Sequence, residues 1–369
     1  MPRGSQPLPN NFLDRGVLDK YMVLPLSEDT IHATYVWIDG TKEHLRCKTR
    51  IIKFVPKSPA DLPLWTYDGA STFQEHETFS DIYLHPVAIY KDPFLGGSSI
   101  LVLCETYYKY NDQPTESNKR KSCLEIVKKC VKDDPWFGFE QEYCLLGMDE
   151  RPFGWPVMGY PSPQGPYYCG VGTHFVFGRQ IAAAHLRACL YAGIKIYGTN
   201  GERMASQWKF QVGPSDGISV ADDLIMSRFI LHRLSEEFGI MASLAPKPVS
   251  GDWHGSGCLT DVSTKAMRQP GGIKEIENAI GKLSKRHEKH IAVYDPQQGK
   301  DNALRLIGIF CTSPIGEFSS GVDTREASVR IPRSVADTGS GFFEDRRPSS
   351  NCDPYAVMEI MLRTICLDE

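Results

Sequence analysis

Hydrophobic and polar positions alternate in short runs through the first third of the chain. Residues 32–40 (HATYVWIDG) alternate and end in an Asp-Gly turn, and residues 45–54 (LRCKTRIIKF) follow. This pattern predicts a β-hairpin. Residues 81–90 and 99–108 predict further strands. We therefore expect residues 24–108 to form a small β-rich domain.

A helical period replaces this alternation after the polar stretch KYNDQPTESNKRKS. Four segments place apolar residues three or four positions apart and end near a glycine or a turn: residues 122–133, 180–193, 221–239 and 271–294. The pattern predicts an α+β protein with a larger C-terminal domain at residues 113–369. In the last helix, His287 and His290 could form a metal pair, but a solvated helix face is the favoured interpretation because no third ligand is near in sequence.

The composition of the chain mainly excludes certain partners and cellular locations. The chain has 369 residues and a net charge of -4, so we expect neither nucleic acid nor an anionic membrane as a partner. No apolar run is long enough to cross a bilayer. We interpret residues 1–23 as an N-terminal tail, and residues 1–16 within it as a loose polar stretch rather than a targeting segment. Eleven scattered cysteines without a CxxC pair indicate a reduced, cytoplasmic setting in which most are core residues.

The segment PWFGFEQEYCLL contains the first candidate site. As a strand it places Glu140 and Glu142 on one face, opposite Phe137, Phe139 and Gln141. Two carboxylates at this spacing repel each other unless a cation lies between them, and Mg²⁺ prefers such oxygen ligands. A solvated strand face remains the alternative.

Three further segments carry candidate chemistry. GTNGERMASQWKFQVGP places Glu202 in a turn before a strand whose polar face carries Lys209. FFEDRRPSSN and the upstream RIPR combine a carboxylate with arginines that suit a polyphosphate or, equally, a surface ion-pair network: Glu344, Arg330, Arg333, Arg346 and Arg347. The glycine turn in DWHGSGCLTDVSTK is a weak signal alone. Walker A, GxGxxG and GxSxG motifs are absent from the sequence.

Taken in order, these segments resemble the signatures of type II, eukaryotic glutamine synthetase. So do WIDGTKEHLRCKTR, LWTYDGAST, NKRKSC, GWPVMGYPSPQGPYYCGVG, AGIKIYGTN and SSNCDPY. The resemblance runs from about residue 24 to the C-terminus and is nearest to insect and vertebrate cytosolic enzymes. It implies ATP-dependent ligation of ammonia to glutamate with Mg²⁺ or Mn²⁺. It also implies a β-grasp-like N-terminal domain, a catalytic domain with a curved antiparallel sheet, and a decamer of two pentameric rings with sites between neighbouring subunits.

The resemblance assigns roles to residues that match the family pattern. Metal-ligand positions hold Glu140, Glu142, Glu202 and Glu344. Asp68 matches the acid that takes a proton from ammonium, and Arg305, Arg325 and Arg346 match contacts to glutamate and phosphate. The nucleotide-binding positions hold Trp136, Tyr168, Pro214, Ser263, Arg268, Arg330 and Arg347.

Other positions depart from that pattern. QWKFQ places Lys209 at the third carboxylate of one metal site, and GCLTD places Leu259 at the histidine ligand of the other. The remaining departures are Asp261 at a nucleotide-side asparagine, His254 at a glutamate contact, Cys311 at the glutamate that closes over the site, and Phe342 at a tyrosine near the nucleotide.

These departures predict weakened metal binding and a lost or strongly reduced ligase activity, because protonated lysine has no lone pair and leucine cannot coordinate. We expect Lys209 itself to serve as the cation between Glu142 and Glu202. The chain would then be a pseudoenzyme subunit, able to enter mixed oligomers with an active paralogue. The alternative is a weak but genuine glutamate–ammonia ligase in which water replaces the lost ligands.

Overall fold

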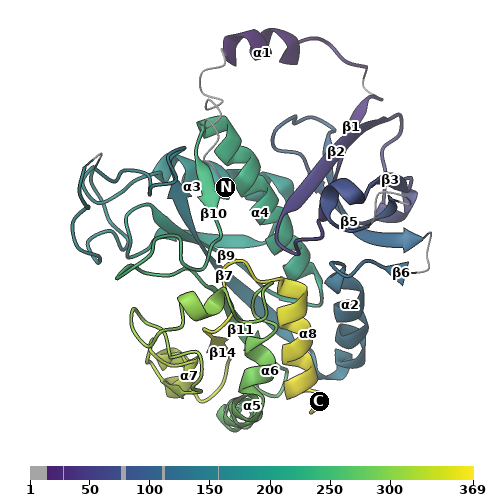
Figure 1. Cartoon of the computed structure of the whole chain (residues 1–369). Coiled ribbons are helices and arrows are strands. Elements are labelled where there is room, and N and C mark those ends of the chain that lie inside the picture. Colours follow the sequence, from purple (N-terminus) through teal and green to yellow (C-terminus); the bar gives the residue numbers. More distant parts are fainter. Residues whose placement is uncertain (1–14, 28, 76–79, 110–112, 157) are drawn as a thin grey trace.

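The small N-terminal sheet has the predicted β-rich character. The computed structural model describes residues 15–27, 29–75, 80–109, 113–156 and 158–369 (Figure 1). The sheet has the order β2-β1-β5-β4-β3, with β6 paired to β5, and β1 runs parallel to β5 while the other pairs are antiparallel. Its strands are β1 (Ile31–Ile38), β2 (Leu45–Ile52), β3 (Trp65–Asp68), β4 (Asp81–Lys91), β5 (Ile100–Lys109) and β6 (Gln113–Pro114).

Strand β1 joins two cores. Successive side chains on a strand point to opposite faces, so Tyr35 enters the core of the small sheet while Val36 enters the large C-terminal core. The predicted hairpin β1–β2 is confirmed. The small sheet extends to Pro114, because β6 pairs with β5.

The second sheet forms the centre of the C-terminal part. Its order is β12-β13-β14-β11-β7-β9-β8, with β10 paired to β7. Its strands are β7 (Trp136–Leu146), β8 (Ile196–Gly201), β9 (Gln207–Asp216), β10 (Met241–Ser243), β11 (Cys258–Ser263), β12 (Ser320–Val322), β13 (Val329–Ile331) and β14 (Phe343–Asp345). The α+β class is confirmed, and the strands of this sheet pair antiparallel, as the resemblance implied, except for β12 and β13, which pair in parallel.

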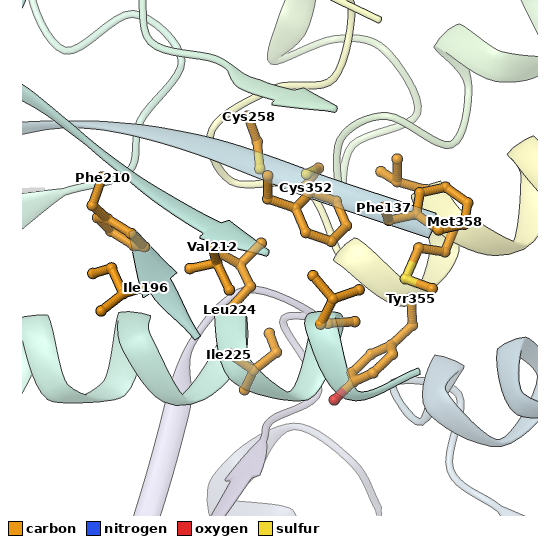
Figure 2. Packing of buried hydrophobic residues seen from close by; sticks show 14 of the residues in the cluster. Phe137, Ile196, Phe210, Val212, Leu224, Ile225, Cys258, Cys352, Tyr355 and Met358 are labelled. Atoms are coloured by element: carbon orange, nitrogen blue, oxygen red, sulfur yellow. The ribbon is translucent and has the colours of Figure 1, made fainter. Parts of the chain in front are cut away.

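Helices cover this sheet and fill the space beside it (Figure 1). They are α2 (Lys119–Lys129), α3 (Arg179–Ala192), α4 (Ser219–Phe238), α5 (Ile273–Lys285), α6 (His287–Ile291), α7 (Arg333–Thr338) and α8 (Pro354–Ile365), whereas α1 (Arg15–Met22) lies apart from this sheet at the top of Figure 1. Short 3₁₀ turns lie at Pro59–Asp61, Ala70–Thr72, Val131–Asp133 and Asn302–Leu304. Figure 2 shows Phe210, Val212 and Ile196 of the sheet packed against Leu224 and Ile225 of α4.

Ion pairs and a tyrosine connect the small sheet to the C-terminal part. The Arg120 guanidinium donates to Glu105 of β5 and to Asp222 of α4, each at 2.8 Å. Tyr90 of β4 donates to Asp223 at 2.9 Å. These buried contacts fix the small sheet beside the N-terminal half of α4.

The helix predicted at residues 271–294 is interrupted at Arg286, which separates α5 from α6. The solvated-face interpretation of His287 and His290 is wrong, since both are buried. His287 bonds to the Ile315 carbonyl, and His290 bonds to Tyr294 and Thr364. Both histidines are therefore satisfied within the core.

The N-terminal tail contains a helix that we did not expect. Residues 1–14 lie outside the described part, but α1 follows at Arg15–Met22 with Val17, Leu18 and Tyr21 exposed. This helix overlaps the stretch predicted to be loose only at Arg15 and Gly16. None of the helices within the described residues is long and apolar enough to span a membrane. The expectation of core cysteines is confirmed, since seven of the eleven are buried and all are free.

Candidate active site

Strand β7 carries the two central glutamates, and its neighbours determine what faces them. Its alternation buries Phe137, Phe139 and Gln141 on the core side, as the sequence predicted. The antiparallel registers place Lys209 of β9 opposite Glu142 and Leu259 of β11 opposite Glu140. Both departures from the family pattern therefore lie directly beside the expected metal-ligand carboxylates.

Lys209 occupies the centre of this cluster. Its Nζ donates to Glu140 Oε2 at 2.8 Å and lies 3.4 Å from Glu202 Oε1. Burial alone would lower the pKa of Lys209, but Glu202 and Glu140 outweigh it and raise that pKa, so the ammonium stays charged. We expected Lys209 to lie between Glu142 and Glu202, and one of these two partners is wrong. The lysine bridges Glu140 and Glu202.

Glu142 is held by the backbone instead. The Gly257 N–H donates to Glu142 Oε2 at 2.7 Å. Burial, together with repulsion from Glu202, raises the pKa of the Glu142 carboxyl. Glu142 thus accepts from the backbone, whereas Glu140 and Glu202 lie next to the Lys209 ammonium.

Glu344 on β14 has both carboxylate oxygens engaged. Arg330 Nη1 donates to Oε2 at 2.8 Å and Arg346 Nη1 donates to Oε1 at 2.9 Å. A divalent ion at Glu344 would displace an arginine, and one between Glu140 and Glu202 would meet the Lys209 ammonium. Among the described residues, the carboxylates of this cluster do not form a group of three ligand atoms within 4.8 Å of one another. The residues present therefore do not fit the divalent metal that the family implies.

A polar cavity of about 120 Å³ opens beside this cluster. Its lining combines charged and polar side chains with four of the six substituted positions: Glu142, Tyr168, Glu202, Arg203, Lys209, His254, Leu259, Arg305, Cys311, Arg325 and Arg346. His254 packs against Phe310 with ring centroids 5.4 Å apart, and burial lowers its pKa to about 4, so the imidazole is neutral. Phe310 and Cys311 both have positive φ, which is a strained conformation for residues with a Cβ and shapes this wall.

The arginines divide between the cavity and the core. Arg305 lines the cavity but donates its guanidinium to the backbone carbonyls of residues 346, 347 and 348. Arg325 is exposed at the rim. Arg347, assigned to nucleotide binding by the resemblance, does not line this cavity: it is buried, pairs with Asp345 at 2.6 Å, and contacts His287.

A second, apolar cavity of about 370 Å³ lies at the start of β7. It gathers Trp136, Pro214, Ser263, Arg268, Asp261 and Phe342, as the resemblance implied, together with Tyr197. The Arg268 guanidinium stacks 4.2 Å from the Trp136 ring centre and pairs with Asp134 at 2.6 Å. Burial, with Glu140 and Glu344 nearby, raises the pKa of Asp261.

Three predicted site residues lie elsewhere. Tyr168 lines the polar cavity rather than the apolar one. Arg330 is not among the described residues that line either cavity, and its Nε is buried without a partner in that part of the chain. Asp68 ends β3 in the small sheet, exposed and bonded to Ala70 and Ser71, and the single chain does not bring it to either cavity.

The cavity residues that the sequence did not single out include Arg203 and Tyr197. Arg203 directly follows Glu202 in the same turn, so its position next to a predicted metal ligand could have indicated that it lines the cavity. Tyr197 lies in the family-like segment AGIKIYGTN, where its strand position on β8 could have indicated it.

Comparisons with known proteins agree on one family for this chain. Residues 126–366 match the family described as glutamine synthetase, catalytic domain. The chain is 61% identical over 361 residues to "Glutamine synthetase 2 cytoplasmic" of Drosophila melanogaster, covering 98% of each chain. It is 55% identical to the glutamine synthetase of Panulirus argus and 54% identical to that of Homo sapiens, each over 360 residues, covering 98% of this chain and 99% and 96% of the relatives. This chain belongs to the glutamine synthetase family.

Proposed function

We propose that this chain is a glutamine synthetase relative whose ligase activity is lost or strongly reduced, and which serves as a non-catalytic subunit. The observation that carries the proposal is the Lys209 ammonium, bound to Glu140 at 2.8 Å and close to Glu202 at 3.4 Å. This fixed cation occupies the space between two carboxylates that the family uses for metal. The chain thus places a monovalent cation, the Lys209 ammonium, where the family's ligase reaction requires a divalent metal ion.

The electrostatics of the site supports the loss of metal binding and of ligase activity. Bringing Mg²⁺ between these carboxylates would place it against an ammonium in a partly buried site, where repulsion is poorly screened. Leu259 offers no replacement ligand, and Glu344 is already neutralised by two arginines. Removing one transition-state-stabilising group often costs about a hundredfold in rate, and these losses occur together although they need not add.

The alternative is a weak but genuine glutamate–ammonia ligase. The names of relatives at 54–61% identity favour it, as does Glu142, which makes no direct contact with Lys209 among the described ion pairs and keeps its carboxylate at the cavity wall. In this case Mg²⁺ would retain waters in place of the lost ligands.

The formation of γ-glutamyl hydroxamate distinguishes these functions. The purified chain is assayed with ATP, glutamate, hydroxylamine and either Mg²⁺ or Mn²⁺. A Glu202→Ala variant, prepared in parallel, measures the contaminating background. A rate at this background supports the proposal, whereas turnover near the enzyme median of about 10 per second contradicts it.

We further propose that the chain assembles as the family does, as a decamer of two pentameric rings in the cytoplasm. The position of Asp68 supports a site completed by a neighbour, since this acid is exposed on the small sheet rather than at its own cavity. Mixed rings with an active relative would then contain sites with intact metal ligands served by Asp68 of this chain. Co-expression with a differently tagged active enzyme should yield mixed oligomers whose activity falls with the fraction of this chain. Two separate homo-oligomers, or a monodisperse monomer in light scattering, would contradict the assembly.

A further inference from the structure

A second cluster of potential ligands lies away from both cavities, at the end of α2. Cys130, Asp133 and Cys366 each offer one ligand atom, and these three atoms lie within 4.8 Å of one another. Among the described residues, this is the group of three or more thiol, imidazole or carboxylate side chains whose ligand atoms lie this close together. The sequence did not suggest it, because Cys130 and Cys366 lie far apart along the chain.

We propose that Cys130, Asp133 and Cys366 form a binding site for a thiophilic divalent metal ion, with Zn²⁺ as the best-fitting ion. Zn²⁺ takes thiolate sulfur and carboxylate oxygen together and accepts three protein ligands with water in the fourth position. Two sulfurs disfavour Mg²⁺ and Ca²⁺, which prefer oxygen ligands. The site therefore differs in its metal preference from the expected sites of the catalytic cavity.

The backbone holds the three ligands in place before an ion binds. Cys130 caps α2, with its N–H bonded to the carbonyls of Ile126 and Val127. Asp133 ends the following 3₁₀ turn and donates its N–H to the Cys130 carbonyl at 3.0 Å. Cys366 caps α8, with its N–H bonded to the Leu362 carbonyl. The ligands thus come from two helix ends and one tight turn, which leaves little backbone freedom to lose on binding.

The three ligand side chains differ in their exposure to solvent. Cys130 is fully buried, Cys366 is half-buried and Asp133 is exposed. An ion can therefore enter from the Asp133 side. Burial raises the pKa of both thiols, so they are protonated without metal, and coordination of one M²⁺ forms two metal–sulfur bonds and releases two protons to solvent. Lys282 near Cys366 and Lys129 near Cys130 offset part of the resulting negative charge.

Such an ion would join the C-terminus to the segment that enters β7. Asp134, next to the ligand Asp133, accepts from Arg268 at 2.6 Å, and Arg268 stacks on Trp136. Fixing Asp133 would therefore steady one wall of the apolar cavity. Cys258 and Cys352 also lie close enough to interact, but they are fully buried and belong to no such three-ligand group among the described residues.

Cobalt titration tests the proposal directly. The full chain, reduced and stripped of metal with a chelator, is titrated with Co²⁺ and then with Zn²⁺. We expect thiolate-to-cobalt charge-transfer absorption and tetrahedral visible bands that saturate at one ion per chain and disappear when Zn²⁺ is added. Zn²⁺ should also raise the melting temperature, because it binds the folded state.

Ligand variants and a matched control complete the test. Cys366→Ser and Asp133→Asn change accessible ligands and should each weaken Zn²⁺ binding at least about tenfold, as even the loss of outer-shell partners can do. Cys130→Ser should act likewise, but it alters a core residue, so the other two variants carry the test if it does not fold. Cys169→Ser, an exposed cysteine outside the cluster, should bind as the unmodified chain does.

Three results would overturn the proposal. The first is the absence of a thiolate–cobalt band in the unmodified chain. The second is an unchanged band in both Cys366→Ser and Asp133→Asn. The third is a mass loss of two hydrogens on hydrogen peroxide treatment, mapped to Cys130 and Cys366, without metal binding by the reduced protein. That last result would assign the pair to a disulfide, in which peroxide takes two electrons from the thiols and is reduced to water.

Discussion

The polar and apolar cavities are lined by the same two strands, yet their residues differ in how much of the family pattern they retain. The start of β7 and the end of β11 provide Trp136 and Ser263 to the apolar cavity, whereas Glu142 and Leu259 line the polar one. Lys209, Leu259, His254 and Cys311 all face the polar cavity. In the apolar cavity, the departures from the family pattern are Asp261 and Phe342, which change only polar groups. The stack of Arg268 on Trp136, which forms part of its wall, is kept.

This difference shows that packing and chemistry can be lost separately. The apolar cavity depends on shape and on the stack of Arg268 over Trp136, which need no metal. Beside the polar cavity, the carboxylates that a metal would need are paired with cations of the chain itself: Lys209 with Glu140, and Arg330 and Arg346 with Glu344. These internal ion pairs remove the charge that would attract Mg²⁺, and removing one partner of such a pair would leave the other unpaired and destabilise the fold.

Restoring the polar cavity should have the largest effect. The triple change Lys209→Glu, Leu259→His and Cys311→Glu returns the family residue at each position and should raise hydroxamate formation by at least about a hundredfold. The measurement is the initial rate with Mg²⁺ against that of the unmodified chain. Lys274→Glu, the same change on the exposed face of α5, is the control. Equal rates in the triple variant and the unmodified chain would place the defect elsewhere.

Removing only the lysine charge should affect stability next. Lys209→Met leaves Glu140 and Glu202 partly buried and unpaired, so we expect a loss of about 2 kcal/mol in the free energy of unfolding, somewhat below the cost of breaking a fully buried pair. Mg²⁺ should recover part of this loss in the variant but not in the unmodified chain. Urea unfolding with and without Mg²⁺ measures both effects. Lys53→Met, which breaks an exposed pair with Asp29, should change little.

Much of this site follows from period-two alternation. The pattern of β7 placed Glu140 and Glu142 on one face and predicted their buried neighbours correctly. The same rule, applied to FFEDRR, separates Glu344 and Arg346 from Asp345 and Arg347, and it would have assigned Arg347 to the core where it pairs with Asp345. The helical period likewise extends the apolar stripe of Ile276, Ile280 and Leu283 to His287 and His290.

Other features depend on distant contacts that no local pattern contains. Tyr168 lies in an irregular segment, so no period indicates which cavity it lines. The partner of Lys209 depends on side-chain reach across β7, since its register neighbour is Glu142 but its Nζ bonds to Glu140. The Cys130–Cys366 proximity depends on how α2 packs on α8. These are tertiary facts, and the sequence alone left them open.

A pH titration examines the packing beneath β9, the strand that carries Lys209. His185 is buried against Phe210, and burial lowers its pKa to about 4. Because the unfolded chain binds this proton near pH 6.5 and the folded chain does not, the stabilisation is complete above pH 6.5 and is lost as pH falls toward 4. The contribution should fall by up to about 1.4 kcal/mol per pH unit. His185→Gln should make the free energy of unfolding less sensitive to pH between 7 and 5, whereas an unchanged slope would contradict the assignment.

The smallest expected effect tests whether the apolar cavity still functions. Arg268→Ala removes the cation stacked on Trp136, and we expect ATP affinity to fall about fivefold, equivalent to about 1 kcal/mol for such a contact. Calorimetry with ATP, with and without Mg²⁺, measures it. Arg233→Ala, which removes a guanidinium stacked on Phe94, is the matched control and should leave affinity unchanged. The unmodified chain should bind ATP with little dependence on Mg²⁺, since Lys209 already supplies a fixed positive charge among the carboxylates. Tight binding that strictly requires Mg²⁺ would show that the metal ligands still function, and the contrast between the two cavities would then fail.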